Sequence, residues 1–187
     1  DRNIYNWGND GETRPLTDRI IQVPEFRDRY SFYLNRLINA VFNSNHLDPL
    51  LDELRDKIKD AAAGDIYRTY DYGYSYEDFY ASFDAEAGNH VRRGLKPYIS
   101  ERAGSAQGQL NVNPVDPIVS LMYVSSPNIG ETAELQFLVE DDGAIADVKL
   151  WFMNEGNPVE KPITHWGNGL YYANHPGLLE EGFLEFY

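Results

Sequence analysis

The chain has 187 residues, of which 42% are hydrophobic and 14% aromatic, and this composition excludes a disordered chain. Its 16 basic and 30 acidic residues give a net charge of −14, which would repel the phosphates of a nucleic acid, so we expect no nucleic-acid partner. The lack of cysteine excludes disulfides and thiolate chemistry. No apolar run reaches the roughly 18 residues that a membrane helix needs, so we expect no membrane insertion.

The acidic charge is concentrated in the second part of the chain. Residues 1–113 carry 14 basic and 18 acidic residues, a net charge of −4, whereas residues 114–187 carry 2 and 12, a net charge of −10. Two prolines, Pro114 and Pro117, follow the point where the charge changes, as is typical of a linker between domains. We therefore predict a multidomain α plus β protein, with a small helical bundle over residues 1–113 and a β-sandwich over residues 114–187.

The first predicted helix begins at Pro24, because proline is favoured in the first turn, where its missing N–H would have no partner. Apolar residues then recur every three or four positions, which is the period of a helix with one buried face. The predicted core face consists of Phe26, Tyr30, Leu34, Leu37 and Val41.

Three further helices are predicted in the first part of the chain. Asp48 before Pro49 predicts an N-cap and a helix that ends at Gly64. Ser75 predicts the cap of a short third helix, whose acidic first turn suits the helix dipole, and a last helix is expected from near Pro97. The apolar positions of these helices are Leu50, Leu51, Leu54 and Ile58 in the second, and Phe79 and Phe83 in the third.

After residue 114 the apolar period changes from that of a helix to that of a strand. Residues 133–139 alternate like a half-buried strand, and Asp141-Asp142-Gly143 is typical of a turn. Further strands are expected near residues 121–123, over residues 148–152, after the turn at residues 166–169, and over residues 183–187. Short strands separated by turns are typical of an immunoglobulin-like or fibronectin-like sandwich. Because the last predicted strand reaches the end of the sequence, we expect an incomplete sandwich that lacks its last strand.

Aromatic residues provide the candidate binding sites. Six of the fourteen tyrosines lie between residues 67 and 80, interleaved with aspartate and glutamate. An exposed tyrosine beside a carboxylate suits a sugar or a peptide, because the ring stacks while the acid accepts hydrogen bonds. The alternative is that these rings pack a long connection between helices onto the bundle. The candidate binding residues are Tyr70, Tyr72, Tyr74, Tyr76, Trp151 and Trp166, with Tyr171 and Tyr172 following Trp166.

The residues predict no catalytic set and no metal site. The four histidines lack metal-binding spacing, and neither glycine-rich phosphate motif, Gly-x-Gly-x-x-Gly or Gly-x-x-x-x-Gly-Lys-Ser/Thr, occurs. The Gly-x-Ser-x-Gly motif of serine hydrolases is absent as well. We therefore expect no catalytic residue, no metal and no cofactor in this chain.

Three stretches within residues 1–110 occur in a specific order. Residues 15–30 combine Leu16 and Arg19 with the run Val-Pro-Glu-Phe-Arg at residues 23–27, and residues 50–58 and 94–102 form two later stretches. This ordered set resembles the C-terminal helical part of the spore coat protein H (CotH) type kinases, in which the Val-Pro-Glu stretch opens a helix. The two later stretches resemble the next helix and the closing helix of that family.

Members of that family have an atypical kinase fold that transfers phosphate from ATP to protein, and related proteins occur in secreted or surface chains. The resemblance therefore implies ATP and Mg²⁺ as cofactors of the parent protein. It also implies an upstream kinase lobe as the partner of this chain. The family's catalytic aspartate and its Asp-x-Asp metal element precede the Val-Pro-Glu helix, and residues 1–14 reproduce neither.

The resemblance thus implies a non-catalytic helical piece that supports the kinase lobe, followed by an immunoglobulin-like spacer or adhesion module. The expected location is extracellular or in the cell envelope. A role of this piece in substrate contacts of an active parent kinase is compatible with this hypothesis. The alternative from another functional class is a carbohydrate- or protein-binding module that uses the exposed tyrosines and tryptophans.

Overall fold

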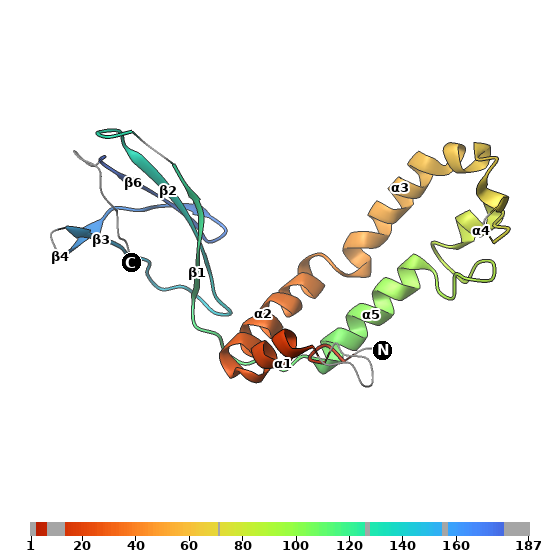
Figure 1. The fold of residues 1–187 in the computed structure, drawn as a ribbon, viewed down its shortest axis with the longest axis horizontal. Helices are drawn as coiled ribbons and strands as arrows, with labels where there is room; N and C mark the ends of the chain where they lie inside the picture. Colours follow the sequence, from red (N-terminus) through yellow and green to blue (C-terminus); the bar gives the residue numbers. More distant parts are fainter. Residues whose placement is uncertain (1–2, 7–13, 71, 126–127, 155–156, 178–187) are drawn as a thin grey trace. The chain divides into compact units, whose positions relative to one another are not determined.

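A computed structural model describes residues 3–6, 14–70, 72–125, 128–154 and 157–177. The chain divides into two compact units, residues 1–113 and residues 114–187. The first unit is helical and the second consists of antiparallel strands (Figure 1). This arrangement confirms the predicted α plus β fold class.

Helices α1 (Pro15–Gln22) and α2 (Pro24–Ala40) are separated only by Val23, whose extended backbone ends one helix and begins the next. Helix α2 begins at Pro24, as predicted. Helix α1 is not among the predicted elements, although it also begins at a proline. Both starts follow the preference of proline for the first helical turn.

The predicted core face of α2 is only partly right: Tyr30 and Leu34 are half-buried, with Leu34 against the buried cluster, but the fully buried residues belong to a neighbouring stripe. Ser31 is fully buried and Ile38 is 6% exposed. Burial of Ser31 is possible because its hydroxyl oxygen lies 2.7 Å from the Tyr5 hydroxyl and donates to the carbonyl of Arg27. Two adjacent stripes of one helix share the same period, so periodicity alone does not choose between them. The half-exposed residues of the predicted face are Phe26 (46%), Leu37 (49%) and Val41 (44%).

A short N-terminal segment completes the core of the helical unit. Ile4 is 1% exposed, its N–H donates to the side chain of Gln109 at 3.0 Å, and its carbonyl accepts from the Tyr30 hydroxyl at 3.0 Å. These bonds hold the segment against α2 and the C-terminal end of α5 (Leu95–Gln109). The buried cluster consists of Ile4, Ile38, Ala103 and Ala106.

Helix α3 (Ser44–Gly64) begins before the predicted N-cap Asp48, and Pro49 lies inside it. Its N-cap is Asn43, whose side-chain oxygen accepts from the N–H of His46 at 3.0 Å. The Asn43 amide donates to two carbonyls near the end of α2, at 3.0 and 3.1 Å. One side chain thus joins two helices, which a local cap signal does not reveal. The end at Gly64 is as predicted.

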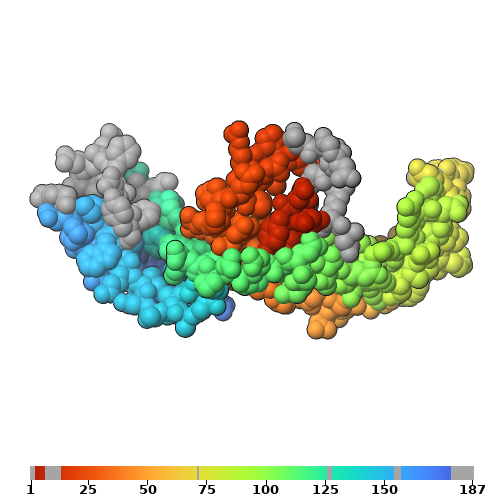
Figure 2. Space-filling model, turned by 90° about the horizontal axis from the view of Figure 1, so that it is seen from below, coloured from red at the N-terminus to blue at the C-terminus, as the bar shows by residue number. Residues whose placement is uncertain are grey.

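The connection between α3 and α5 contains η1 (Arg68–Tyr70) and α4 (Tyr76–Ala81). Ser75 caps α4, as predicted, and α5 begins slightly before Pro97, with Gly94 as its N-cap. Helix α5 contacts both α2 and α3, while α4 packs on α3 at the end of the unit away from α1 (Figure 1). The yellow-green residues of this connection gather at the same end in Figure 2. Among the described helices, none has the length and apolar character needed to span a bilayer.

The second unit contains two antiparallel sheets. One has the order β1 (Ile118–Val124), β2 (Ala133–Glu140), β6 (Leu170–His175), β5 (Thr164–Gly167), and the other pairs β3 (Leu150–Asn154) with β4 (Asn157–Lys161). The predicted strand over residues 133–139 and the turn before β6 are confirmed, with Asn168 at a φ of 51° and Gly169 at 75°. Strand β3 begins later than predicted, and β4 and β5 are not among the predicted strands, because Trp166 and Gly167 of the predicted turn belong to β5. The predicted strand over residues 183–187 lies outside the described residues.

The two sheets share one core. Leu135 and Phe137 of β2 and Ala173 of β6 form a buried cluster with Leu150 and Phe152 of β3. Strand β2 alternates between buried and less buried residues along its whole length, as expected of a strand with one face toward a core.

Candidate functional site

The tyrosine-rich segment, residues 67–80, spans η1, the connection that follows it and most of α4. Tyr70 is 82% exposed and Tyr72 is 64% exposed, whereas Tyr74 and Tyr76 are half-buried. The candidate tyrosines are therefore divided between solvent and the helical unit. Each of the two predicted roles, ligand contact and packing, fits part of the segment.

The aromatic rings of this segment form separate small groups. Tyr72 joins Tyr74, but among the described residues no ring contact links Tyr70 or Tyr76 to that pair. The structure therefore does not arrange the four candidate tyrosines as one stacked row. The contacts, with distances between ring centroids, are Tyr67 with Tyr70 (5.8 Å), Tyr72 with His90 (4.0 Å), Tyr72 with Tyr74 (6.4 Å), Tyr76 with Phe79 (6.0 Å) and Tyr76 with Tyr80 (6.1 Å).

Asp78 anchors the connection around α4. Its carboxylate accepts from the N–H of Ser75 at 2.8 Å and from the N–H of Gly88 at 3.0 Å, while the Ser75 hydroxyl accepts from the N–H of Asp78. This reciprocal pair is a capping box. The hydrogen bond from the Ser75 backbone, the largest of these effects, holds the pKa of Asp78 below its usual value. Both carboxylate oxygens are occupied, so Asp78 acts as a structural anchor.

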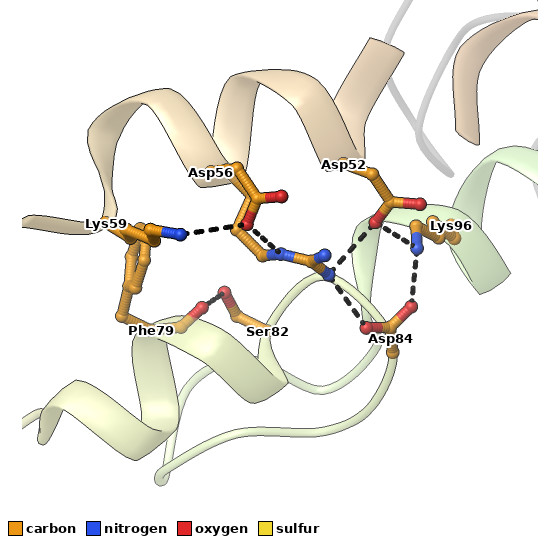
Figure 3. A network of polar contacts seen from close by, with 8 residues as sticks. Asp52, Asp56, Lys59, Phe79, Ser82, Asp84 and Lys96 are labelled. Atoms are coloured by element: carbon orange, nitrogen blue, oxygen red, sulfur yellow. Dashed lines mark hydrogen bonds and ion pairs between the residues drawn. The ribbon is translucent and has the colours of Figure 1, made fainter. Parts of the chain in front are cut away.

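A network of ion pairs joins α3, the turn after α4 and the start of α5 (Figure 3). The Lys96 ammonium lies 2.7 Å from Asp52 and 2.9 Å from Asp84. The Arg55 guanidinium lies 3.0 Å from Asp52 and 3.5 Å from Asp84. The hydrogen bond with Asp52 raises the pKa of Lys96, and the same bond lowers the pKa of Asp52. Each cation therefore contacts both carboxylates.

Aromatic rings cover Arg55 from the side of α4. Only 13% of the Arg55 side chain is exposed, and its guanidinium carbon lies 4.7 Å from the ring centroid of Tyr80 and 5.7 Å from that of Phe83. Phe83 is itself buried and contacts Phe79 edge-on at 5.6 Å. A planar guanidinium suits such rings because it combines charge with a flat apolar face.

The backbone at the start of α5 completes the connection to α3 and α4. The N–H groups of Leu95 and Lys96 donate to the carbonyls of Ser82 and Phe83, at 3.0 and 2.9 Å. A Cβ atom at Gly94 would lie 2.4 Å from the backbone nitrogen of Ala85. Only glycine therefore permits this close approach of α5 to the turn.

This network is not among the sites predicted from the sequence. Its only local signal is the spacing of Asp52 and Arg55, three residues apart on one helix. Two cations balance two carboxylates, so the network holds elements together and presents no free acid or base. Among the described residues, no group of three or more His, Asp or Glu is placed to hold a metal ion.

The two candidate tryptophans belong to the second unit. Trp151 lies on β3, where it is half-buried and paired with Glu160 of β4. Trp166 lies on β5, is 56% exposed and stacks on Tyr172 of β6, with ring centroids 5.0 Å apart and planes 6° apart. The structure thus brings Trp166 together with Tyr172 and places Trp151 on the other sheet.

Comparison with known proteins gives a match for the helical unit. A family model described as "CotH kinase protein" matches residues 1–105, which is more than half of the chain. No curated protein and no solved structure matches the chain significantly. The matched residues include α1 to α4 and most of α5.

Proposed function

Because the chain belongs to the CotH kinase protein family, we propose that its helical unit is a non-catalytic part of a CotH-type kinase domain and supports the lobe that binds ATP. The observation that carries this proposal is an apolar face on α3 that the described residues leave half exposed. The ion-pair network joins α3, which carries this face, to α5, and the buried cluster joins α5 to α2.

Three apolar residues on α3, each one turn after the last, form this face. Leu50, Leu54 and Ile58 are 43%, 44% and 47% exposed. Asp52 and Arg55, on another side of the helix, make the polar contacts with α5 and the turn after α4. An amphipathic helix normally buries its apolar face, and a group of exposed apolar residues is typical of a surface that another domain covers. The partner that we propose for this face is the nucleotide-binding lobe.

The donor groups in the described part of the chain do not fit Mg²⁺ and ATP. Residues 1–14 contain no Asp-x-Asp element, and the chain contains no glycine-rich phosphate loop. The described residues also lack a metal-binding group of carboxylates and histidines. ATP and Mg²⁺ are therefore assigned to the nucleotide-binding lobe, and no catalytic step is assigned to the residues of this chain.

For the second unit we propose an immunoglobulin-like module that acts as a spacer or adhesion domain in an extracellular or cell-envelope protein. In that fold, strands A, B, E and D form one sheet, and strand C belongs to the other. The order β1, β2, β6, β5 corresponds to A, B, E, D, and β3 with β4 corresponds to C with its neighbour C′. The strand order and the shared core support this assignment.

An apolar groove between the sheets also supports it. The groove has a volume of about 280 Å³, and its lining includes Val119 and Leu121 of β1, which are 62% and 47% exposed. In an immunoglobulin-like sandwich, strands F and G continue the sheet of strand C and cover the inner faces of strands A and B. The groove lies where these strands would pack.

Calorimetry with Mg²⁺ and ATP tests the proposed support role. We expect no binding by this chain alone and binding by a parent protein that includes the nucleotide-binding lobe. Magnesium-dependent ATP binding by this chain alone would contradict the proposal, because it would place a nucleotide site among these residues.

A pair of variants on α3, made in the parent protein, tests the covered face. Leu54→Asp should lower the free energy of unfolding by about 3 kcal/mol or more, because it would bury an unpaired charge. Ala63→Asp, at an exposed position elsewhere on the same helix, should cost about 0.5 kcal/mol. Equal effects of the two substitutions, measured by chemical denaturation, would show that the lobe does not cover this face.

A further inference from the structure

The outer face of the four-stranded sheet carries a row of aromatic and uncharged polar side chains. Residues directly opposite one another in antiparallel strands point to the same side of a sheet. Tyr123 is opposite Gln136, Gln136 is opposite Tyr172, and Tyr172 is opposite Thr164. The flanking residues of Gln136, Leu135 and Phe137, are buried in the core, so this row lies on the side away from the core. We call this surface, with Trp166 and Asn174, the outer face.

A β-bulge places Tyr123 on the outer face. The register of β1 against β2 shifts between Leu121 and Tyr123, so Met122 is an extra residue. Leu121 lines the groove on the inner side of the sheet. Without the extra residue, Tyr123 would point to that side as well, because side chains alternate along a strand. Bulges commonly re-aim a side chain next to a functional site.

A second register shift accompanies Trp166. The shift lies between His165 and Gly167 of β5, where β5 pairs with β6. His165 stacks on Tyr171, whose side chain lines the inner groove, whereas Trp166 stacks on Tyr172 of the outer face. Trp166 lies on the same side of β5 as Thr164, two residues before it, so ordinary alternation places it on the outer face, and of the two irregular positions only the bulge in β1 re-aims a ring.

The outer face has the features of a stacking surface for a sugar. Trp166 is 56% exposed although Tyr172 covers one side of its ring, so its exposed area comes from the other side and the edge. Tyr123 is 46% exposed. The Tyr172 hydroxyl donates to Asn174 at 2.6 Å, which fixes the ring beneath Trp166. Rigid aromatic rings beside amide and hydroxyl groups match the apolar faces and hydroxyls of a pyranose.

Charge restricts the class of ligand. Strands β1, β2, β5 and β6 contain no lysine or arginine, and the two basic residues of this unit, Lys149 and Lys161, lie outside these strands. Glu134 is an exposed residue of β2, and the unit as a whole is strongly acidic. An anionic polymer would therefore be repelled, whereas a neutral one would not.

We propose that the outer face binds a neutral polysaccharide, with Trp166 and Tyr123 stacking on sugar rings and Gln136, Thr164 and Asn174 bonding to hydroxyls. Tyr123 on β1 and Trp166 on β5 lie three strand spacings apart, roughly 14 Å, which is about the length of three sugar rings. This inference goes beyond the support role of the helical unit, because it depends on the second unit alone.

Binding of the full chain to soluble polysaccharides tests the proposal. The probes are hydroxyethyl cellulose, xyloglucan and a β-1,3-glucan, with alginate as the anionic comparison, in affinity electrophoresis and calorimetry. We expect binding to at least one neutral probe and none to alginate. Trp166→Ala should weaken that binding tenfold or more, and Tyr123→Ala should weaken it as well. Trp151→Ala, on the other sheet, is the matched control and should not change it.

Unfolding of Trp166→Ala would make a loss of binding uninformative, so Trp166→Phe is measured beside it. The phenyl ring should retain part of the affinity, and the thermal transitions of both variants should match that of the unmodified chain. Lack of binding to every neutral probe would overturn the proposal, as would unchanged affinity of Trp166→Ala or preferential binding to alginate. ATP binding by the parent protein is a separate readout, so failure here leaves the proposed support role standing.

Discussion

Replacing Arg55 by methionine should destabilise the helical unit by about 1.5 kcal/mol. The methionine retains an apolar stem of similar length but loses the guanidinium group. That group stacks on Tyr80 at 4.7 Å, a contact worth about 0.5–1 kcal/mol, and pairs with the partly exposed carboxylates of Asp52, Asp84 and, at 3.9 Å, Asp56, each worth about 0.2–1 kcal/mol. Asp52 and Asp84 would keep Lys96 as a partner, so the substitution leaves neither carboxylate without an ion pair. For this reason the cost should stay well below that of an uncompensated buried charge.

Urea denaturation followed by far-ultraviolet circular dichroism measures this change in the helical unit. Arg55→Lys should lose about half as much stability, because it keeps the charge but not the planar stack. Lys59→Met is the matched control on the same helix. Lys59 is 44% exposed and lies 3.9 Å from Asp56, so its loss should cost less than about 0.5 kcal/mol. Equal effects of Arg55→Met and Lys59→Met would show that the network does not stabilise the helical unit.

Three further predictions concern a close backbone approach, a helix cap and a histidine. Gly94→Ala should cost about 1–3 kcal/mol, because its Cβ would meet the backbone nitrogen of Ala85 at 2.4 Å, whereas Gly104→Ala, with no atom within 4 Å, should be neutral or stabilising in the same denaturation assay. Asn43→Ala should cost about 1–2 kcal/mol, since it removes the cap of α3 and two bonds to α2; an effect as small as that of Gly104→Ala would refute the role of the cap. Burial lowers the pKa of His175, so the stability that its neutral form contributes is complete above the usual histidine range, near 6.5, and is lost as the pH falls through that range. Urea denaturation followed by tryptophan fluorescence at neutral and mildly acidic pH should show this loss, and His175→Leu should reduce it; an unchanged pH dependence would contradict the assignment.

Local chemistry alone predicts where several elements begin and end. Pro24 starts α2, Ser75 caps α4 and Gly64 ends α3, as their sequence contexts indicate. Each of these signals acts on a backbone group within a few residues, so no distant contact is needed to interpret it. The alternation over residues 133–139 is similarly local, and it gives both the strand and its buried face. The ordered stretches that resemble CotH proteins can likewise be recognised from the sequence without knowledge of distant contacts.

The candidate sites depend on contacts that the local sequence does not contain. Asp52 and Lys96 are 44 residues apart in sequence, and nothing near either residue indicates that they meet. The exposed tyrosines and tryptophans are visible as a composition, but the structure decides that Tyr70 is exposed while Tyr74 and Tyr76 are half-buried.

The local sequence also does not determine which side of a helix or strand faces the core. Helix α2 offers two adjacent stripes of equal period, and the N-terminal segment around Ile4 selects the stripe that contains Ser31. In the sheet, one extra residue in β1 reverses the direction of Tyr123. The sequence by itself determined the family, the fold class and the local starts and stops. Tertiary structure decided which side chains meet and which face solvent, because burial and pairing depend on residues that are distant in the chain.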